Sequence, residues 1–476
     1  MAVASGAETA DYMKVSLVEG QILENVSLWQ GHIDENGIVS LHPVLAAKLT
    51  EAVAASLAAA TPRDVHLPAI RNKVHSVIGM RRAGKTTFLK QLCAERRATA
   101  PPERSIYLSF DDERLGTLEV QQLSLLLEEH YRRYPDLRGK HQVTWLLDEI
   151  QLVPGWERFV RRILDSELVE VVVSGSSAKM LSREVHTSLR GRGIETEVQP
   201  FGFREHLRHR GSEPERAPTR WTAAERSRVE KAFRGFLAEG GFPEAQGMPA
   251  SVRIPLLQGY VETVMFRDVV ERHGLTQVAA LRWLIRHCLR NPGRLLSVHG
   301  LCNDLRAQGH AVGKDTVHAM VSHLQDAFLF TAVPLATESV RRQNSNPRKI
   351  YPVDHGLIAA FDPSGKSNLG HHLEVVVHTE LRRRRADVGY VRNADGTEVD
   401  FLVRRPGATE ELIQVCADAG DPETLARELR ALESAREEYP NATQRLLIGD
   451  RSEARLAVGD VIVQAIPEWL LAASPS

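Results

Sequence analysis

The strongest chemical signal in the sequence is the run Gly79-Met-Arg-Arg-Ala-Gly84-Lys85-Thr86, which follows an apolar stretch and opens an amphipathic one. It matches G-x-x-x-x-G-K-[S/T], the pattern of a loop that wraps phosphate groups. Glycines let backbone N–H groups turn toward phosphate, and the helix that follows adds a favourable dipole. Lys85 would reach the β- and γ-phosphates of ATP, and the Thr86 hydroxyl would hold Mg²⁺. The residues expected to bind ATP are Gly79, Arg82, Ala83, Gly84, Lys85, Thr86 and Thr87.

A second signal is Trp145-Leu-Leu-Asp148-Glu149, an apolar strand that ends in two acids. Asp148 would hold Mg²⁺ through water, and Glu149 would polarise the water that attacks the γ-phosphate. A strand that merely ends in an acidic turn is the alternative. The position of this pair, downstream of Lys85 in an α/β pattern, favours the catalytic interpretation.

Two further candidates carry weaker signals. Ser176 follows a third apolar run, Val173-Ser174-Gly175, and would sense the γ-phosphate or position the attacking water, although a plain turn explains this run equally well. Arg192, in the run Leu189-Arg190-Gly191-Arg192, would neutralise transition-state charge, across a subunit interface if the chain assembles. Solvated surface charge is the alternative for these arginines.

Four apolar runs must position these residues: 74–79, 104–110, 143–149 and 169–175. Amphipathic segments at 86–97 and 118–133 lie between them and predict helices. Continuous apolar strands separated by helices are typical of a parallel sheet that is covered on both faces. The predicted fold class is therefore α/β, with a P-loop NTPase sheet whose strand ends gather the candidate residues at one edge.

The chain of 476 residues is too long for one core, and its patterns divide it into several segments. The first is a leader with an Ala-rich helix near 43–60, and residues 341–349 form a basic linker. We predict these units: leader 1–66, ATPase core 67–207, helical lid 208–276, winged-helix-like segment 277–340 and a terminal domain 350–476.

Composition excludes several classes of protein. Sixty basic and 61 acidic side chains leave a net charge of -1, so no overall basic field indicates a nucleic-acid partner. The four cysteines form no C-x-x-C pair, which argues against a structural zinc site or a disulfide framework. The first residues do not resemble a signal peptide, and no long uncharged apolar stretch indicates a membrane span. We therefore expect a cytoplasmic protein with no membrane partner.

Longer stretches of the sequence resemble a known family. The runs GMRRAGKTTFLKQL, LLDEIQLVPGWERFVRRILD, VVVSGSSAKMLSREVHTSLRGRGIETEVQPFGFREHL, GGFPE and PRKIYPVDHGLIAAF are similar to AAA-family ATPases that carry a C-terminal DUF4143 domain. This resemblance implies an ATP-binding core, a helical lid, a winged helix and a restriction-nuclease-like terminal domain. By motif, Lys85, Asp148 and Glu149 match the family's catalytic positions, while Ser176 falls at the sensor step and Arg192 at the G-R step.

The resemblance also implies a Mg²⁺ site in the terminal domain. Glu374 and Asp400 match its helix and strand carboxylates, with Glu398 beside the second. Where relatives often have an acid and a lysine, this chain has Gln414 and Cys416, which remove a charged ligand and an ammonium group. We therefore predict a degenerate nuclease-like domain that does not cleave DNA.

The segment 295–333 has a helix, a glycine-containing turn and a second helix starting near Lys314, which fits a helix-turn-helix. Its balance is mildly basic, since residues 277–335 hold six basic and three acidic side chains. Two functions follow: an ATPase that remodels DNA as a motor, helicase or branch-migration protein, or a STAND-like nucleotide switch that acts on a protein partner. A nuclease gated by ATP is a third, disfavoured by Gln414 and Cys416. Candidate partners are therefore DNA, a second copy of the chain and a protein.

Overall fold

The computed structural model describes residues 40–68, 70–175, 191–362, 369–449 and 459–472. Its first sheet has five parallel strands in the order β2-β3-β4-β1-β5. Their bounds are β1 Val74–Ile78, β2 Ser105–Ser109, β3 Val143–Asp148, β4 Val169–Ser174 and β5 Gly193–Glu197. Four of these strands, β1 to β4, coincide with the apolar runs of the sequence. Every residue of β1 and β3 is buried, as expected for the strands of a parallel sheet that is covered on both faces. The predicted α/β P-loop NTPase sheet is thereby confirmed.

Strand β5 is absent from the sequence-based prediction. It lies at the edge of the sheet beside β1, and its sequence Gly-Ile-Glu-Thr-Glu is only partly buried. An edge strand has one neighbour and packs less apolar surface, so its sequence does not show the continuous apolar run of the central strands.

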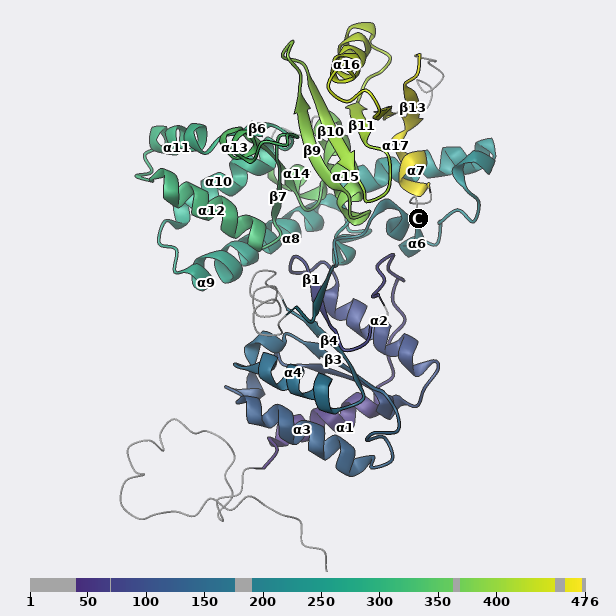
Figure 1. Cartoon of the computed structure of the whole chain (residues 1–476), viewed down its shortest axis with the longest axis vertical. Coiled ribbons are helices and arrows are strands. Elements are labelled where there is room, and N and C mark those ends of the chain that lie inside the picture. Colours follow the sequence, from purple (N-terminus) through teal and green to yellow (C-terminus); the bar gives the residue numbers. More distant parts are fainter. Residues whose placement is uncertain (1–39, 69, 176–190, 363–368, 450–458, 473–476) are drawn as a thin grey trace, which may run out of the picture.

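Helices cover both faces of this sheet (Figure 1). They are α1 Pro43–Ala54, α2 Lys85–Arg97, α3 Val120–Arg133 and α4 Trp156–Ser166, with short 3-10 turns at Pro102–Arg104, Glu113–Leu115 and Ile150–Leu152. Helix α1 belongs to the predicted leader, but Leu45, Leu49 and Ala52 are buried in the same core as the strands. Residues 40–66 therefore pack on the sheet instead of forming a separate leader, and the Ala-rich helix ends at Ala54, not near residue 60.

A largely helical region follows the first sheet. It contains α6 Phe203–His209, α7 Ala223–Glu239, α8 Ala250–Thr263, a π-helical segment Val264–Val270 and α9 Glu271–His273, with 3-10 turns at Pro218–Arg220 and Pro243–Ala245. Thr222 caps α7 and forms a capping box with Glu225, which explains where this helix begins. The glycine pair before Pro243 ends α7, with Gly240 at a positive φ of 81°.

The next region combines five helices with a small antiparallel sheet ordered β6-β8-β7. Its elements are α10 Val278–Arg290, β6 Leu295–Leu296, α11 Val298–Ala307, α12 Lys314–Asp326, β7 Phe330–Val333, α13 Val340–Ser345, β8 Arg348–Pro352 and α14 Gly356–Phe361. The predicted linker 341–349 is wrong: its residues belong to α13 and β8, and Lys349 is buried. The basic composition of this segment predicted a linker, but the charge of Lys349 is paired with carboxylates inside the fold, as described below.

The terminal region is a second α/β sheet ordered β13-β12-β11-β10-β9. Strands β9 to β11 are antiparallel neighbours, whereas β11, β12 and β13 run parallel. Its elements are α15 Leu369–Arg383, β9 Asp387–Arg392, β10 Glu398–Arg404, β11 Glu411–Cys416, α16 Pro422–Ala435, β12 Thr443–Ile448, β13 Ile462–Ala465 and α17 Ile466–Leu471.

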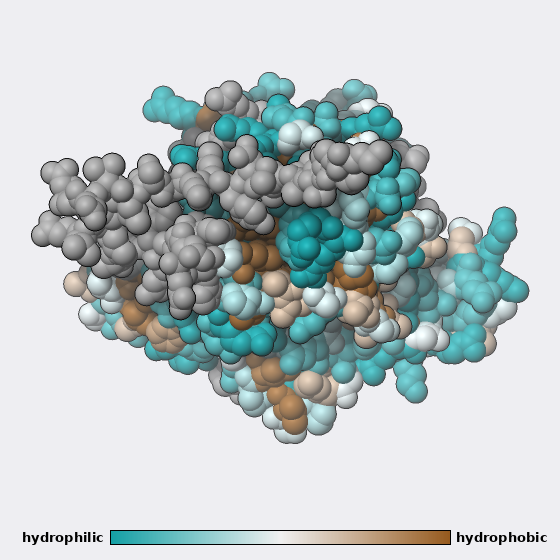
Figure 2. Space-filling model, turned by 90° about the horizontal axis from the view of Figure 1, so that it is seen from below, coloured by the Kyte–Doolittle hydropathy of each residue, from teal (hydrophilic) through white to brown (hydrophobic). Residues whose placement is uncertain are grey.

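These regions form two lobes (Figure 1). The first lobe is the five-stranded parallel sheet with its helices, and the second lobe holds everything from α6 onward. On the face in Figure 2, apolar residues form separate patches between hydrophilic side chains. Within the described residues, none of the helices combines the length and the apolarity that crossing a bilayer requires.

Candidate nucleotide-binding site

At two positions of the loop between β1 and α2, the backbone adopts a positive φ that favours glycine. Gly79 has a φ of 142°, and a Cβ at this position would lie 2.2 Å from the Val198 carbonyl oxygen. Gly84 has a φ of 101° and immediately precedes α2. The loop therefore presents its backbone close to neighbouring chain and opens toward a helix N-terminus, which is the geometry that cradles phosphate groups.

Lys85 lies at the start of α2 and is largely buried. Its Nζ donates to the carbonyl oxygens of Gly79 at 2.9 Å and Met80 at 3.1 Å. Burial lowers the pKa of Lys85, while the nearby Glu149 and Asp148 oppose that shift. The ammonium group is thus held over the loop by two neutral acceptors, which a phosphate group can replace.

Asp148 collects three hydroxyl groups at the carboxyl end of β3. Thr86 Oγ1 and Tyr107 Oη each donate to its Oδ2 at 2.8 Å, and Ser174 Oγ donates to its Oδ1. Burial, together with the charge of Asp148, raises the pKa of Tyr107 well above its ordinary value, so this hydroxyl remains a donor. The 2.8 Å contact brings the motif residues Thr86 and Asp148 together.

Tyr107 and Ser174 are members of this cluster that the sequence analysis did not assign. Ser174 ends β4 and is buried, and Tyr107 lies two residues before the end of β2. A signal for Ser174 existed in the run Val173-Ser174-Gly175, where the predicted sensor was instead Ser176. Ser176 lies outside the described residues.

Glu149 adopts a left-handed backbone conformation, with a φ of 55° and a ψ of 39°. For a non-glycine residue this costs about 1–3 kcal/mol and persists only where the surroundings enforce it. Its backbone N–H donates to Ser174 Oγ at 3.4 Å, and its carboxylate accepts a hydrogen bond from Gln151 Nε2. The turn directs Glu149 away from the strand, next to the acid that ends it.

The two arginines inside the loop reach the helical region of the second lobe. Arg81 Nε donates to Asp268 Oδ2 at 2.7 Å, and Asp268, in the π-helical segment, is only 1% exposed. Arg82 Nη1 lies 3.6 Å from Glu244 Oε2, in the run GGFPE, and packs over the Tyr260 ring. The phosphate-binding loop is therefore tied by charge to the segment predicted as a lid.

A third arginine supports the loop from outside the motif. Arg63 Nη1 donates to the Ala83 carbonyl at 3.0 Å, and Nη2 donates to the Gln199 carbonyl. Its Nε donates to Glu205 Oε1 at 2.8 Å, and Arg383 on α15 lies 3.5 Å from Glu205 Oε2. Sequence reasoning missed Arg63 because it lies in the region predicted as a leader, far from the motif in sequence.

Arg192 lies away from this site within the same chain. It immediately precedes β5, and its carbonyl accepts the Val74 N–H at the start of β1, whereas the phosphate loop follows the end of β1. A five-residue strand spans roughly 16 Å, and the Arg192 side chain pairs with Asp165. Arg192 therefore does not reach the nucleotide site of its own chain, and its predicted role across a subunit interface stays a prediction. Thr87 is exposed on α2 and lines a cavity together with residues 55–60 and Tyr107.

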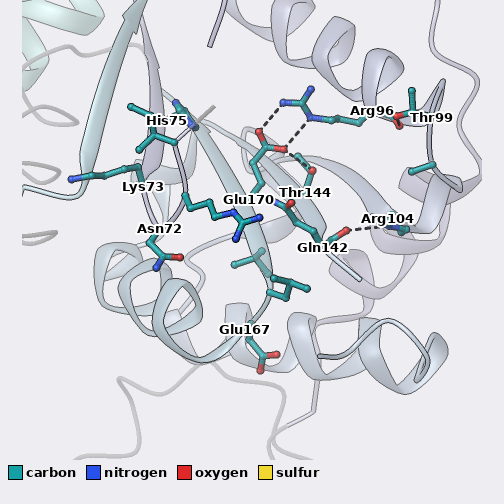
Figure 3. A pocket seen from close by; sticks show the side chains of 15 residues that line it. Asn72, Lys73, His75, Arg96, Thr99, Arg104, Gln142, Thr144, Glu167 and Glu170 are labelled. Carbon is teal, nitrogen blue, oxygen red and sulfur yellow. Dashed lines mark hydrogen bonds and ion pairs between the residues drawn. The ribbon is translucent and has the colours of Figure 1, made fainter. Parts of the chain in front are cut away.

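A cavity of about 790 Å³ lies at the amino-terminal ends of β1, β3 and β4 (Figure 3). One ion pair lies within its lining: Arg96 donates twice to Glu170, at 3.0 and 2.8 Å, and Thr144 donates to the same carboxylate. This edge of the sheet is opposite to the phosphate loop, so the cavity is not the nucleotide site.

Comparison with known proteins agrees with this geometry. Residues 71–207 match a family described as an AAA domain, and residues 230–368 match a domain of unknown function, DUF8612. "Uncharacterized protein MJ1544" of Methanocaldococcus jannaschii is 30% identical over 420 residues, which cover 86% of this chain and 90% of that protein. The chain belongs to the MJ1544 family.

An "Uncharacterized protein" of Haemophilus influenzae is 25% identical over 398 residues, which cover 83% of this chain and 93% of that protein. Among solved structures, the Walker-type ATPase PABY2304 of Pyrococcus abyssi has a TM-score of 0.40 and 12% identity, covering 67% of this chain and 95% of that one. The DUF8612 match begins within α7 and extends through the β6-β8-β7 sheet, and the DUF4143 resemblance stays a proposal.

Proposed function

We propose that this protein binds ATP at residues 79–86 and hydrolyses it with Mg²⁺, coupling hydrolysis to the binding or remodelling of DNA. One observation carries the proposal: the loop, Lys85, Thr86, Asp148 and Glu149 converge at the carboxyl edge of one parallel sheet, with Thr86 and Asp148 in direct contact. This edge is where open α/β sheets bind their ligands.

Each residue has a distinct task in this mechanism. Lys85 exchanges its contacts with Gly79 and Met80 for the β- and γ-phosphates, and the loop N–H groups hold the remaining phosphate oxygens. Thr86 and Asp148 would hold Mg²⁺, which when bound offsets the charge of the phosphate oxygens. Glu149 accepts a proton from the attacking water, and its left-handed turn sets the direction of the carboxylate.

The loop arginines offer a physical route from nucleotide to lid. Arg81 and Arg82 are paired with Asp268 and Glu244 of the second lobe. Phosphate groups attract the same guanidinium groups, so a bound triphosphate competes with these lid carboxylates. Hydrolysis then changes the balance of that competition and moves the lid relative to the first lobe.

The DNA assignment rests on the region from α10 to β8. Helices α11 and α12, the turn between them and the β6-β8-β7 sheet have the element order of a winged helix, and α12 begins at Lys314 as the sequence predicted. The mildly basic charge of 277–335 allows weak phosphate contacts. We accordingly propose a winged-helix module that contacts the DNA backbone.

A switch that acts on a protein partner is the second candidate. It is favoured by the charge of the terminal region, where residues 370–476 hold 13 basic and 19 acidic side chains. An acidic surface repels DNA, whereas winged helices and α/β domains also bind proteins. In a ring-shaped homo-oligomer, Arg192 would act on the nucleotide of a neighbouring subunit.

The deciding experiment is steady-state ATP hydrolysis with and without single-stranded, duplex and branched DNA at two salt concentrations. A several-fold stimulation by one DNA form, lost at higher salt and in Lys85→Ala, supports a DNA-acting ATPase. Slow turnover that is indifferent to every DNA form supports the protein-directed switch.

Glu149→Gln separates binding from catalysis. We expect this variant to bind ATP as tightly as the wild type while kcat falls by about 100-fold or more, because the amide cannot accept the proton. Nucleotide binding by fluorescence titration is the control, and unchanged hydrolysis by Glu149→Gln would remove the assignment of this residue.

A further inference from the structure

Lys349 is an unusual lysine because its charged end is enclosed in the protein. It lies on β8, in the small β6-β8-β7 sheet, and is 3% exposed. Its Nζ lies 2.8 Å from Glu398 Oε1, 2.9 Å from Asp400 Oδ1 and 3.2 Å from Glu374 Oε1. Three carboxylates therefore surround one ammonium group.

These carboxylates come from the terminal region. Glu374 lies on α15, and Glu398 and Asp400 lie two residues apart on β10, so their side chains share one face of that strand. They are the residues that the resemblance to nuclease-like domains implies as Mg²⁺ ligands. The cation that they hold here is instead supplied by a strand of a different sheet.

Two further donors contact the carboxylates of this cluster. Tyr351 Oη donates to Glu374 Oε1 at 2.6 Å, and the Val415 N–H donates to Asp400 Oδ2 at 3.1 Å. Gln414, which stands where relatives have an acid, accepts the Asp400 N–H and donates to Glu428 on α16 at 2.6 Å. Its amide thus connects two chain segments instead of offering a charged ligand.

We propose that Lys349 is the built-in cation of the Glu374–Glu398–Asp400 cluster and closes this nuclease-like site to divalent metal ions. A metal ion at the centre of the cluster would have to displace a buried ammonium group that already pairs with all three carboxylates. Across the described residues, no group of three or more His, Cys, Asp or Glu side chains is arranged to hold a metal ion.

The ion pairs of Lys349 also connect two parts of the fold. The ion pairs join the β6-β8-β7 sheet to the terminal sheet, since β8 contributes the cation and β10 contributes two of the anions.

Binding of Mn²⁺ to the nucleotide-free full chain tests this proposal, measured by electron paramagnetic resonance of the free ion. We expect wild type and Asp400→Asn to bind the same number of Mn²⁺ ions. Lys349→Ala should bind one additional ion per chain, and Lys349→Ala with Asp400→Asn should lose it again. Lys349→Arg keeps the positive charge and should behave as wild type.

Two results would overturn the proposal. The first is a wild-type protein whose Mn²⁺ binding falls in Asp400→Asn or in Glu398→Gln, because the cluster would then be a metal site. The second is a Lys349→Ala protein that melts at the temperature of the matched surface variant Lys140→Ala and still binds no additional ion. If Lys349→Ala does not fold, the comparison of wild type with Glu398→Gln decides: equal binding supports closure, and a loss of binding rejects it. ATP hydrolysis plays no part in this test.

Discussion

Glu205 is the side chain whose neutralisation tests how the two lobes and the phosphate loop are joined. It lies on α6, is fully buried, and stands between Arg63 of the first lobe and Arg383 of α15. One carboxylate oxygen accepts from Arg63 Nε and the Asp64 N–H, and the other accepts from the Gly202 N–H at 2.9 Å. Glu205→Gln keeps the size of the side chain but removes its charge.

The structure gives the expected magnitude. A glutamine amide would turn its NH₂ group toward a backbone N–H, either that of Asp64 or that of Gly202. It would also remove the carboxylate that pairs with the buried Arg63, whereas Arg383 would keep its ion pair with Glu380. Removing one partner of a buried ion pair costs about 3–5 kcal/mol, so we expect Glu205→Gln to lower the free energy of unfolding by that amount. The exposed pair Arg138–Glu128 is the control, since Glu128→Gln should cost less than about 1 kcal/mol.

The same change should weaken ATP binding. Arg63 holds the Ala83 carbonyl of the phosphate loop, and it keeps that position through Glu205. Loss of one charge-assisted hydrogen bond of about 1.5 kcal/mol corresponds to about a tenfold rise in the ATP Kd. Urea unfolding followed by circular dichroism and ATP titration by calorimetry measure the two effects.

The pH dependence of this stability has a definite sign. Burial alone would raise the pKa of Glu205, but Arg63 and Arg383 outweigh it and hold the pKa below its ordinary value. A carboxylate with a lowered pKa stabilises the fold above its unfolded pKa of about 4.3. That contribution is lost as the pH falls through the folded pKa. A Glu205→Gln protein with wild-type stability at pH 7 would refute the argument.

Two further predictions concern the lid and the buried histidines. Arg81→Ala removes the contact between the phosphate loop and Asp268, so ATP turnover should lose its dependence on lid movement. We therefore expect the kcat with Mg²⁺–ATP, measured by steady-state kinetics, to differ from that of the wild type. The control is Arg267→Ala, because Arg267 is exposed and lies on the same π-helical segment as Asp268. Burial lowers the pKa of His130, His355 and His372 to about 4 each. The unfolded chain binds protons more readily at these positions, so stability should already fall as the pH decreases from about 6.5 to about 4. A melting temperature that is constant over this interval would contradict this prediction.

Much of the fold was predictable because its cause is local. The apolar runs that became β1 to β4 must be buried on both faces, and that requirement is visible in any such sequence. The site residues Gly79, Lys85 and Thr86 were predictable for the same reason, since their spacing alone shapes a loop around phosphate. Asp148 followed from its place at a strand end, because parallel strands end at one edge.

Other features were not predictable because they depend on contacts between distant segments. Tyr107 and Ser174 reach Asp148 only through the strand order β2-β3-β4, and Arg63 reaches Ala83 only because residues 40–66 fold onto the sheet. Arg192 had a plausible motif position, but the direction of β5 places it at the opposite edge.

Lys349 shows most clearly the difference between features that depend on local sequence and features that depend on contacts between distant segments. Its sequence neighbours are basic and polar, which predicted a solvated linker, yet three carboxylates from α15 and β10 enclose it. The sequence alone determined the phosphate loop, the acids beside it and the α/β class, since these depend on short spacings and on burial. Only the tertiary structure decided which charges pair, because pairing depends on distances between segments that the chain brings together on folding.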